Sequence, residues 1–368
     1  MSAADRPASA NADDLATRLQ SAGFVRLVAP RDGDSAAAVG LLASGLDAIG
    51  VPYQISVTPF SERADCSTDA DLTVAVGRSA AGADLTIGLD GASSPTAHAV
   101  AAAFGSERLP LALAGAVAAE GHPGDELASR AADDGIERCP GVGVPTSDRA
   151  DGLAHSTLVH APFSGDVTAT EAVVSGIDPD DGRALASQVA LAVGSDPDGT
   201  PRGGERVERL LRPLVGGPFE TITGYADVLD CAVRERPGVG VGVALGGVDR
   251  ETALDAWRIH GSAAHRTVRD ARTGRYDGLF VARCDATPPV GTVARLLAEF
   301  RSPEPLVLVV GDGVAAARAV GDDPLAVGGL LERTAAATGG TGGGTARVGR
   351  ARFDAEPAEF VAAFKEAV

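Results

Sequence analysis

Short apolar runs that alternate with helical stretches fill the first 120 residues, and this pattern constrains the fold more than any other feature of the sequence. Four segments are predicted as strands: residues 24–28, 53–57, 72–76 and 85–89. The last two are short and continuous, as buried parallel strands are. Three segments have the spacing of helices: residues 35–49, 95–104 and 109–119. The alternation predicts a parallel sheet with crossover helices, an α/β fold.

The second part of the chain carries another α/β pattern. Turn-forming residues crowd residues 195–205 and predict a linker there. After it we expect strands over residues 239–245, 278–282, 306–310 and 347–353, helices over residues 290–300 and 357–368, and a glycine-rich loop over residues 339–344. The predicted organisation is a disordered tail (1–14), a first α/β domain (15–194), the linker (195–205) and a smaller α/β domain (206–368).

Charge is distributed unevenly along the chain. Fifty acidic and 32 basic side chains give a net charge of −18, and Lys365 is the only lysine. Such a surface is typical of proteins that stay soluble at very high salt. Residues 1–200 hold 28 acidic and 11 basic residues (net −17), whereas residues 201–368 hold 22 and 21 (net −1). The second part is therefore relatively basic, either because it meets an anionic ligand or because it forms a buried domain interface.

The sequence offers no membrane segment or secretion signal. No apolar run reaches the roughly 18 to 20 residues that a bilayer crossing needs, and the first residues lack the cationic start and apolar centre of a leader. We expect a cytoplasmic protein with no membrane partner. The four cysteines, Cys66, Cys139, Cys231 and Cys284, do not have zinc-site spacing and are interpreted as small core residues.

Two carboxylates, Asp32 and Asp34, flank Gly33 directly after the first predicted strand. Sheets of this class place their ligands at the carboxyl ends of the strands. Carboxylate oxygens there suit a Mg²⁺ or Mn²⁺ ion that holds a phosphate. The alternative is a helix cap, since Asp34 precedes Ser35 and an alanine run.

Several motifs together resemble the DHH phosphoesterase superfamily. The run from Pro30 to Ala38 resembles its first motif, H-x-D-x-D-G-x-x-[SA], and Leu85 to Ala92 lies where its Asp-His-His motif lies. Residues 338–345 are similar to the G-G-G-H loop of the DHH-associated domain, and residues 216–230 resemble the archaeal RecJ-like branch. The resemblance spans most of residues 24–368. It implies a parallel-sheet DHH-type domain followed by a smaller α/β DHH-associated domain, with a cleft between them.

The resemblance also implies two Mn²⁺ ions, but this chain departs from the ligand pattern. Asp32, Asp34 and Asp90 are kept as candidate residual metal ligands. The other family positions are changed: Pro30 for the first histidine, Gly77 or a near neighbour for the second-motif aspartate, Gly91 and Ala92 for the histidine pair, and Ala118 or Ala119 for the last aspartate. Three carboxylates can hardly seat two ions about 3.5 to 4 Å apart. We therefore expect no required cofactor, or Mn²⁺ or Mg²⁺ at a residual site, with Glu120, His98 and His122 as alternative replacement ligands.

In the second domain, a glycine run and nearby arginines are the candidate nucleic-acid contacts. Glycines let backbone amides approach phosphate oxygens, and arginines following them add positive charge. The candidates are Gly342, Gly343, Gly344, Thr345, Arg347, Arg350 and Arg352, with Thr345 where the family has histidine. Six further arginines lie within residues 258–283, near few base-stacking aromatics apart from Trp257, Tyr276 and Phe280. The alternative is a solvated face on which arginines pair with local acids.

The resemblance implies single-stranded DNA or RNA as the ligand. We expect a RecJ-like replication or repair factor that binds without cutting, akin to the RecJ-derived subunit that joins GINS and the MCM helicase. The alternative is a Mn²⁺-dependent single-strand exonuclease or phosphodiesterase that uses Asp32, Asp34 and Asp90 as its catalytic residues. A third hypothesis is a scaffold whose cleft is closed.

Overall fold

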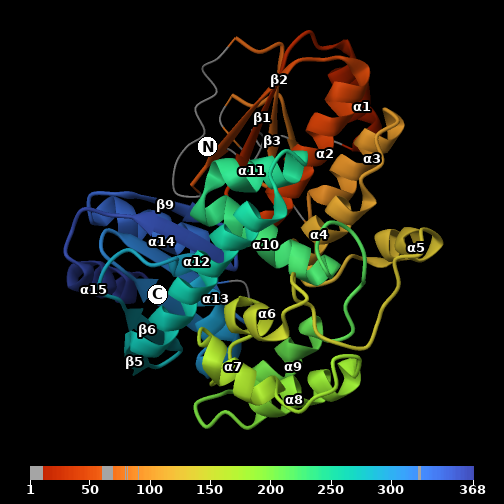
Figure 1. The fold of residues 1–368 in the computed structure, drawn as a ribbon. Coiled ribbons are helices and arrows are strands. Elements are labelled where there is room, and N and C mark those ends of the chain that lie inside the picture. The colour runs from red at the N-terminus through yellow and green to blue at the C-terminus, as the bar shows by residue number, and fades with distance from the viewer. Residues whose placement is uncertain (1–10, 60–68, 79, 81, 90, 322–324) are drawn as a thin grey trace.

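The structure is a computed structural model, and it describes residues 11–59, 69–78, 80, 82–89, 91–321 and 325–368. Two β-sheets lie at different ends of the molecule, with helices between and around them (Figure 1). The strands are β1 (Val25–Pro30), β2 (Tyr53–Thr58), β3 (Leu72–Val76), β4 (Leu85–Ile87), β5 (Arg272–Tyr276), β6 (Leu279–Arg283), β7 (Leu306–Val310), β8 (Val314–Ala319), β9 (Thr341–Gly344) and β10 (Val348–Arg352).

Helices make up most of the remaining regular structure. They are α1 (Ala12–Ser21), α2 (Gly33–Ile49), α3 (Ser94–Ala103), α4 (Leu109–Glu120), α5 (Asp125–Asp133), α6 (Arg149–His155), α7 (Val167–Val174), α8 (Gly182–Gly194), α9 (Pro201–Val207), α10 (Ile222–Glu235), α11 (Pro237–Leu245), α12 (Arg250–Asp270), α13 (Val290–Leu296), α14 (Val327–Ala337) and α15 (Pro357–Ala367). A 3₁₀ turn, η2 (Glu208–Leu210), follows α9, and a π-helical turn, η3 (Leu297–Arg301), extends α13.

The first sheet is parallel throughout, in the order β2-β1-β3-β4. Its central strand β1 is buried along its whole length, as a strand covered on both faces must be. The chain leaves β1 and enters α2 at once, so the Asp32–Asp34 turn lies at the carboxyl edge of the sheet. Gly50, with φ of 73°, ends α2 in the left-handed conformation that favours glycine. The strands and helices predicted for this part are confirmed.

The second sheet has six strands in the order β5-β6-β7-β8-β10-β9. Only β6 and β7 pair in parallel; the other neighbours are antiparallel. This mixed sheet and the parallel sheet confirm the predicted α/β fold with two different sheets.

Three hydrophobic cores underlie this arrangement, and they group the chain differently from the predicted domain ranges. The first core combines residues 15–131 with residues 214–257 of α10, α11 and the start of α12. A second core lies around residues 142–210 and 264–316, and a third lies under β6 to β10 and α15. The ranges 15–194 and 206–368 stay a prediction, whereas the cores show α10 and α11 packed on α2.

Two predicted elements were wrong, a strand and an open loop. Residues 239–245, predicted as a strand, lie in α11, because the valine–glycine alternation serves close helix packing: a Cβ on Gly240 would lie 2.4 Å from the Val233 backbone. The predicted linker 195–205 contains the start of α9 at Pro201, and the predicted tail 1–14 includes the start of α1 at Ala12, capped by Asn11. Residues 1–10 lie outside the described residues.

The second correction concerns the glycine run. Residues 341–344 form the edge strand β9 instead of an open loop. The reason is contact with α14: a Cβ on Gly342 would lie 2.5 Å from the Leu331 carbonyl oxygen, and one on Gly328 would lie 2.4 Å from the Gly344 carbonyl carbon. These glycines let a strand and a helix approach closely.

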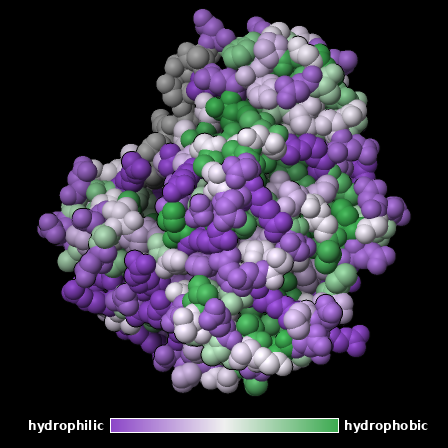
Figure 2. Space-filling view, in the orientation of Figure 1, coloured by the Kyte–Doolittle hydropathy of each residue, from purple (hydrophilic) through white to green (hydrophobic). Residues whose placement is uncertain are grey.

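The surface is mainly polar. Figure 2 shows hydrophilic residues over much of one face, with smaller hydrophobic areas between them. Among the described helices, none has the length and apolar character that a membrane crossing requires.

Candidate functional site: a cleft with an acidic and a basic wall

A cavity of about 430 Å³ lies where the first sheet, α10 and the second sheet meet. One wall carries carboxylates: Asp32 and Asp34 after β1, and Asp227 and Asp230 on α10. A second group of lining residues, called the basic wall below, comprises Arg295, Arg318 and Arg350 with Glu299, and Arg209 and Arg234 complete the set of lining arginines. The cleft implied by the resemblance is therefore present, and groups from both halves of the sequence line it.

Asp32 and Asp34 both accept backbone hydrogen bonds at helix starts. Asp32 is the N-cap of α2 and accepts from the Ser35 amide at 2.9 Å. Asp34 accepts from the Ser93 amide at 2.6 Å and the Ser94 amide at 3.0 Å, where α3 begins. The cap alternative is thus present, although Asp32 caps α2 and Asp34 serves the next helix. Burial raises the pKa of both carboxyls, that of Asp34 to about 6.

Asp230 and Arg234 form a buried ion pair beside this turn. Arg234 donates from Nε to Oδ2 at 2.9 Å and from Nη2 to Oδ1 at 2.7 Å of Asp230, a forked geometry. Asp230 Oδ1 also accepts from the Gly33 amide at 2.8 Å. Despite burial, which opposes ionisation, the Arg234 charge holds the pKa of Asp230 at about 2. Sequence reasoning missed this pair; its only local signal is the Asp-x-x-x-Arg spacing on one helix face.

The groups that face the turn do not match a two-metal ligand set. Among the described residues, no three His, Cys, Asp or Glu side chains gather as a metal site would require. Gly77 has φ of 70°, and a Cβ there would lie 2.3 Å from Ser35 Oγ, so an aspartate in its place would strain the backbone and require Ser35 to move. Asp90 lies outside the described residues. The donor set shown here therefore does not fit a bimetallic centre.

Of the three alternative replacement ligands, Glu120 lies in the cavity lining, and His98 and His122 do not. Glu120 lines the cavity but its Oε1 accepts from the Ala92 amide at 3.3 Å. His122 lies near Glu120 at 3.9 Å on the exposed surface. His98 is buried in α3 and is not among the residues that line the cavity.

The basic wall is built around one buried glutamate. Glu299, with a side chain 3% exposed, lies 3.2 Å from Arg318, 3.6 Å from Arg209 and 3.9 Å from Arg295. A single carboxylate thus faces three guanidinium groups. Such a local excess of positive charge on one wall favours an anion there.

Asp227 holds the two walls together through hydrogen bonds. This buried carboxylate accepts from Trp257 Nε1 at 2.9 Å and from the Thr157 amide and hydroxyl at 3.0 and 2.5 Å. Arg295 donates to the same Thr157 hydroxyl at 2.9 Å. Trp257 is fully buried, so the expectation that it stacks a base is wrong.

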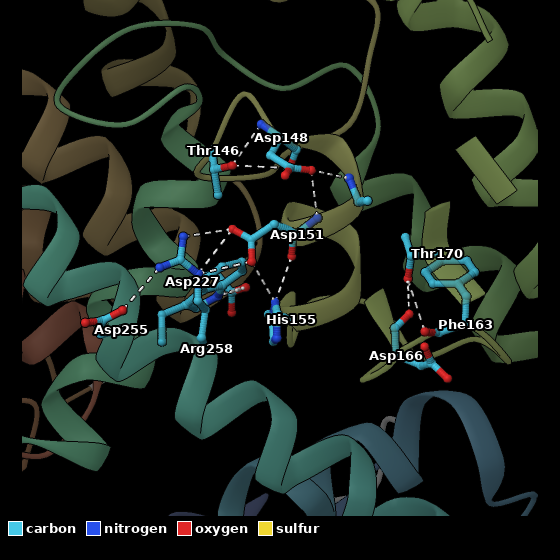
Figure 3. A network of polar contacts seen from close by, with 12 residues as sticks. Thr146, Asp148, Asp151, His155, Phe163, Asp166, Thr170, Asp227, Asp255 and Arg258 are labelled. Carbon is cyan, nitrogen blue, oxygen red and sulfur yellow. Dashed lines mark hydrogen bonds and ion pairs between the residues drawn. The ribbon is translucent and has the colours of Figure 1, made fainter. Parts of the chain in front are cut away.

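A second polar network fastens α12 to α6 behind the cleft. Figure 3 shows Arg258 of α12 directed at Asp151 of α6, with His155 on the other side of that carboxylate. The Arg258 to Asp151 distance is 3.0 Å, and hydrogen bonds from His155 and Arg258 lower the pKa of Asp151 to about 2. This network uses arginine of the 258–283 cluster for local pairing, as the solvated-face alternative expects.

Only some of the candidate nucleic-acid contacts in the second sheet line the cavity. Thr345 and Arg350 line the cavity, whereas Gly342, Gly343, Gly344, Arg347 and Arg352 are absent from its lining. Arg347 donates to the Gly321 carbonyl, and Arg352 lies at the far end of β10. The guanidinium of Arg350 lies over Gly291, where a Cβ would come within 2.5 Å of its Nη2.

Comparison with known proteins agrees with this architecture. The chain is similar to the crystal structure of exonuclease RecJ bound to manganese, with a TM-score of 0.55 and 15% identity over 98% of this chain and 94% of that one. It is also similar to CDC45 from Entamoeba histolytica, with a TM-score of 0.61 and 8% identity over 97% and 98% of the two chains. The chain therefore has the fold of RecJ and CDC45, as the motifs predicted.

Sequence comparison is more specific. Residues 271–366 match the family described as "Uncharacterized protein rrnAC1427, C-terminal domain". The protein rrnAC1427 of Haloarcula marismortui is 48% identical over 378 residues, an alignment that covers 96% of each chain. This protein therefore belongs to the rrnAC1427 family.

Proposed function

We propose that this protein binds single-stranded nucleic acid in the cleft, as a RecJ-like replication or repair factor that does not hydrolyse it. The observation that supports binding is the basic wall, where Arg209, Arg295 and Arg318 share the single carboxylate of Glu299. Guanidinium groups stay charged at any working pH and bind phosphate with two parallel hydrogen bonds. Arg350 adds a cation to the same wall.

The absence of hydrolysis is supported by the acidic wall. Asp34 is engaged by two amides, and Asp230 by Arg234 and the Gly33 amide. Two-metal hydrolysis needs carboxylates that are available to bridge and coordinate both ions. We propose accordingly that neither Mn²⁺ nor Mg²⁺ is required for binding.

The partners proposed are single-stranded DNA or RNA, together with GINS and the replicative helicase. The protein partners rest on the RecJ-like resemblance alone. Co-purification of the tagged chain with GINS at molar KCl, lost when the chain is omitted, is the result this part of the proposal expects.

Two arginines of one strand give a matched test of binding. Arg350 lines the cavity and Arg352 of the same strand does not. We expect Arg350→Gln to weaken binding of a fluorescent single-stranded oligonucleotide about tenfold and to lower the salt slope by about one unit, since one phosphate contact is lost. Arg352→Gln should leave both nearly unchanged. The measurement is fluorescence anisotropy over a range of KCl concentrations.

The same preparation separates the two candidate functions. An end-labelled oligonucleotide incubated with Mn²⁺ should stay intact. Release of mononucleotides that Asp32→Ala abolishes would establish the exonuclease instead. Equal losses in the Arg350→Gln and Arg352→Gln variants would show that binding lies outside the cavity.

A further inference from the structure

Arg234 holds a central place in the acidic wall. Its guanidinium forks onto both oxygens of Asp230, at 2.9 and 2.7 Å, and the side chains of the pair are only 18% and 17% exposed. Asp230 in turn accepts from the Gly33 amide, the residue between Asp32 and Asp34. A positive charge from α10 is thereby fixed against the turn that follows β1.

The turn and α10 are in direct contact. A Cβ on Gly33 would lie 3.0 Å from Asp230 Cβ and 2.9 Å from Ala118 Cβ, so α10 and α4 close over the turn on two sides. The Arg234 charge also acts on Asp32, where it lowers the pKa against the larger, opposing effect of burial. Asp32 reciprocally helps to raise the pKa of Arg234.

The carboxylate oxygens of the wall are largely engaged by N–H donors. Both oxygens of Asp34 accept amides, both oxygens of Asp230 accept the guanidinium, and Oδ1 of Asp32 accepts the Ser35 amide. A divalent ion coordinates such oxygens at about 2.0 to 2.3 Å, where it would displace these donors and meet the Arg234 charge.

We propose that the guanidinium of Arg234 supplies in this cleft the positive charge that a divalent metal ion would supply, and that it thereby excludes Mn²⁺ and Mg²⁺ from the Asp32–Asp34 turn. Unlike a bound ion, a guanidinium cannot dissociate or lose its proton at working pH. The charge balance of the acidic wall is therefore set by the sequence and not by metal supply. This inference rests on the contacts of α10 and not on the nucleic-acid binding proposed above.

Substitution of Arg234 tests the inference without any nucleic acid. Isothermal titration of the full chain with Mn²⁺ in KCl, with free Mn²⁺ followed by its paramagnetic resonance signal, compares the wild type, Arg234→Gln and Arg236→Gln. Arg236 is the matched control, an exposed arginine at the end of the same helix. We expect no saturable binding by the wild type or the control. Arg234→Gln should bind Mn²⁺ saturably, with an affinity at least about tenfold above the highest value that the wild-type titration allows, a change of ~1.4 kcal/mol.

The variant Arg234→Lys distinguishes the effect of the positive charge at position 234 from the effect of the side chain's shape. It keeps a cation and should gain no Mn²⁺ affinity. Circular dichroism checks that each variant is folded. Saturable Mn²⁺ binding by the wild type, weakened by Asp32→Asn, would overturn the inference, and so would a folded Arg234→Gln variant without a gain. If Arg234→Gln does not fold, the double variant Asp230→Asn/Arg234→Gln decides: it lacks both buried charges and should bind Mn²⁺ more tightly than the wild type. The same double variant without a gain would overturn the inference.

Metal and nucleic-acid readouts keep this inference distinct from the proposed function. Loss of metal exclusion leaves the contrast between Arg350→Gln and Arg352→Gln in anisotropy unaffected. Failure of oligonucleotide binding leaves the Mn²⁺ titrations equally informative.

Discussion

The two walls of the cleft both bury ionised groups, but they balance charge differently. On the acidic wall, Asp230 and Arg234 match one carboxylate to one guanidinium, and a backbone amide occupies a further lone pair. On the basic wall, Glu299 is shared by Arg209, Arg295 and Arg318. A carboxylate and a guanidinium that neutralise each other leave little net charge to attract a ligand. Several guanidinium groups around one carboxylate leave a net positive charge, which attracts anions. This difference supports the proposal made above, in which the first wall is structural and the second wall binds an anionic ligand.

The largest expected effect is on the acidic wall. Asp230→Ala leaves the buried guanidinium of Arg234 and the Gly33 amide without their acceptor. We expect a loss of about 3–5 kcal/mol in the free energy of unfolding, the usual cost of breaking a buried pair on one side. Denaturant unfolding followed by circular dichroism measures it. Asp249→Ala, which removes an exposed cap of α12, is the control with a smaller loss. A loss for Asp230→Ala no larger than for Asp249→Ala would show that the acidic wall is not a structural pair.

A pH effect tests what supports the basic wall. His160 Nδ1 lies 3.0 Å from His265 Nδ1, and Arg301 lies 3.2 Å from His160 Nε2. Arg269 adds a further positive charge, and burial and these cations lower the pKa of His160 to about 2 and of His265 to about 3. Both rings are neutral in the folded protein at neutral pH.

The sign follows from proton uptake. Below pH 6.5 the unfolded chain binds protons at these two histidines and the folded protein does not, so stability falls on acidification until pH approaches 3. The expected slope is about 1.4 kcal/mol per pH unit for each ring. Asp34, with its pKa raised to about 6, acts oppositely between pH 6 and 3.8, because there the folded protein binds the extra proton. Denaturant unfolding measured from pH 7 to 4.5 gives the sum of the histidine and Asp34 contributions to the free energy of unfolding. His160→Gln should reduce the loss of stability on acidification, whereas His122→Gln, a change at an exposed histidine, should not. Equal slopes in the wild type and His160→Gln would contradict the neutral pair.

Glu299→Gln sharpens the comparison from the side of the basic wall. The glutamine keeps the size and the acceptor oxygen but removes the shared negative charge. We expect a stability loss of about 2–3 kcal/mol because three guanidinium groups lose their counter-charge. Single-stranded oligonucleotide affinity should rise several-fold. Glu304→Gln, which removes a partner of Arg275 away from the cavity, is the control. Stronger binding in both variants would mean that the effect is one of net charge and not of this wall.

The sequence was sufficient for the first sheet and for its turn. Buried parallel strands are short apolar runs, and the stop at Gly50 is a local signal, so β1 to β4 and α2 to α4 could be placed from local pattern. The valine–glycine run of α11 could not, because its period of two satisfies a strand pattern while its packing on α10 and α2 is tertiary.

The ion pairs of the site were beyond local pattern for a related reason. The contact between Gly33 and Asp230 joins residues 197 positions apart, and Glu299 meets arginines from three separate elements. Only the fold brings such partners together, and a sequence shows their charges without their pairing. The motifs pointed to Asp32 and Asp34 correctly as cleft residues, but the guanidinium beside them had no place in the family pattern.

The smallest expected effect concerns the glycine run of the basic half, which supports either phosphate contact or close packing. Gly342 and Gly343 are neighbours on β9: a Cβ on Gly342 would lie 2.5 Å from the Leu331 carbonyl oxygen, whereas a Cβ on Gly343 meets nothing within 4 Å. If packing requires the run, Gly342→Ala should cost about 1–3 kcal/mol of stability and Gly343→Ala less than about 0.5 kcal/mol. Oligonucleotide affinity of folded Gly343→Ala should equal that of the wild type, because this glycine is absent from the cavity lining. A marked loss of oligonucleotide affinity in Gly343→Ala with unchanged stability would show that the glycine run contacts the nucleic acid. The binding surface would then extend from the basic wall along β9.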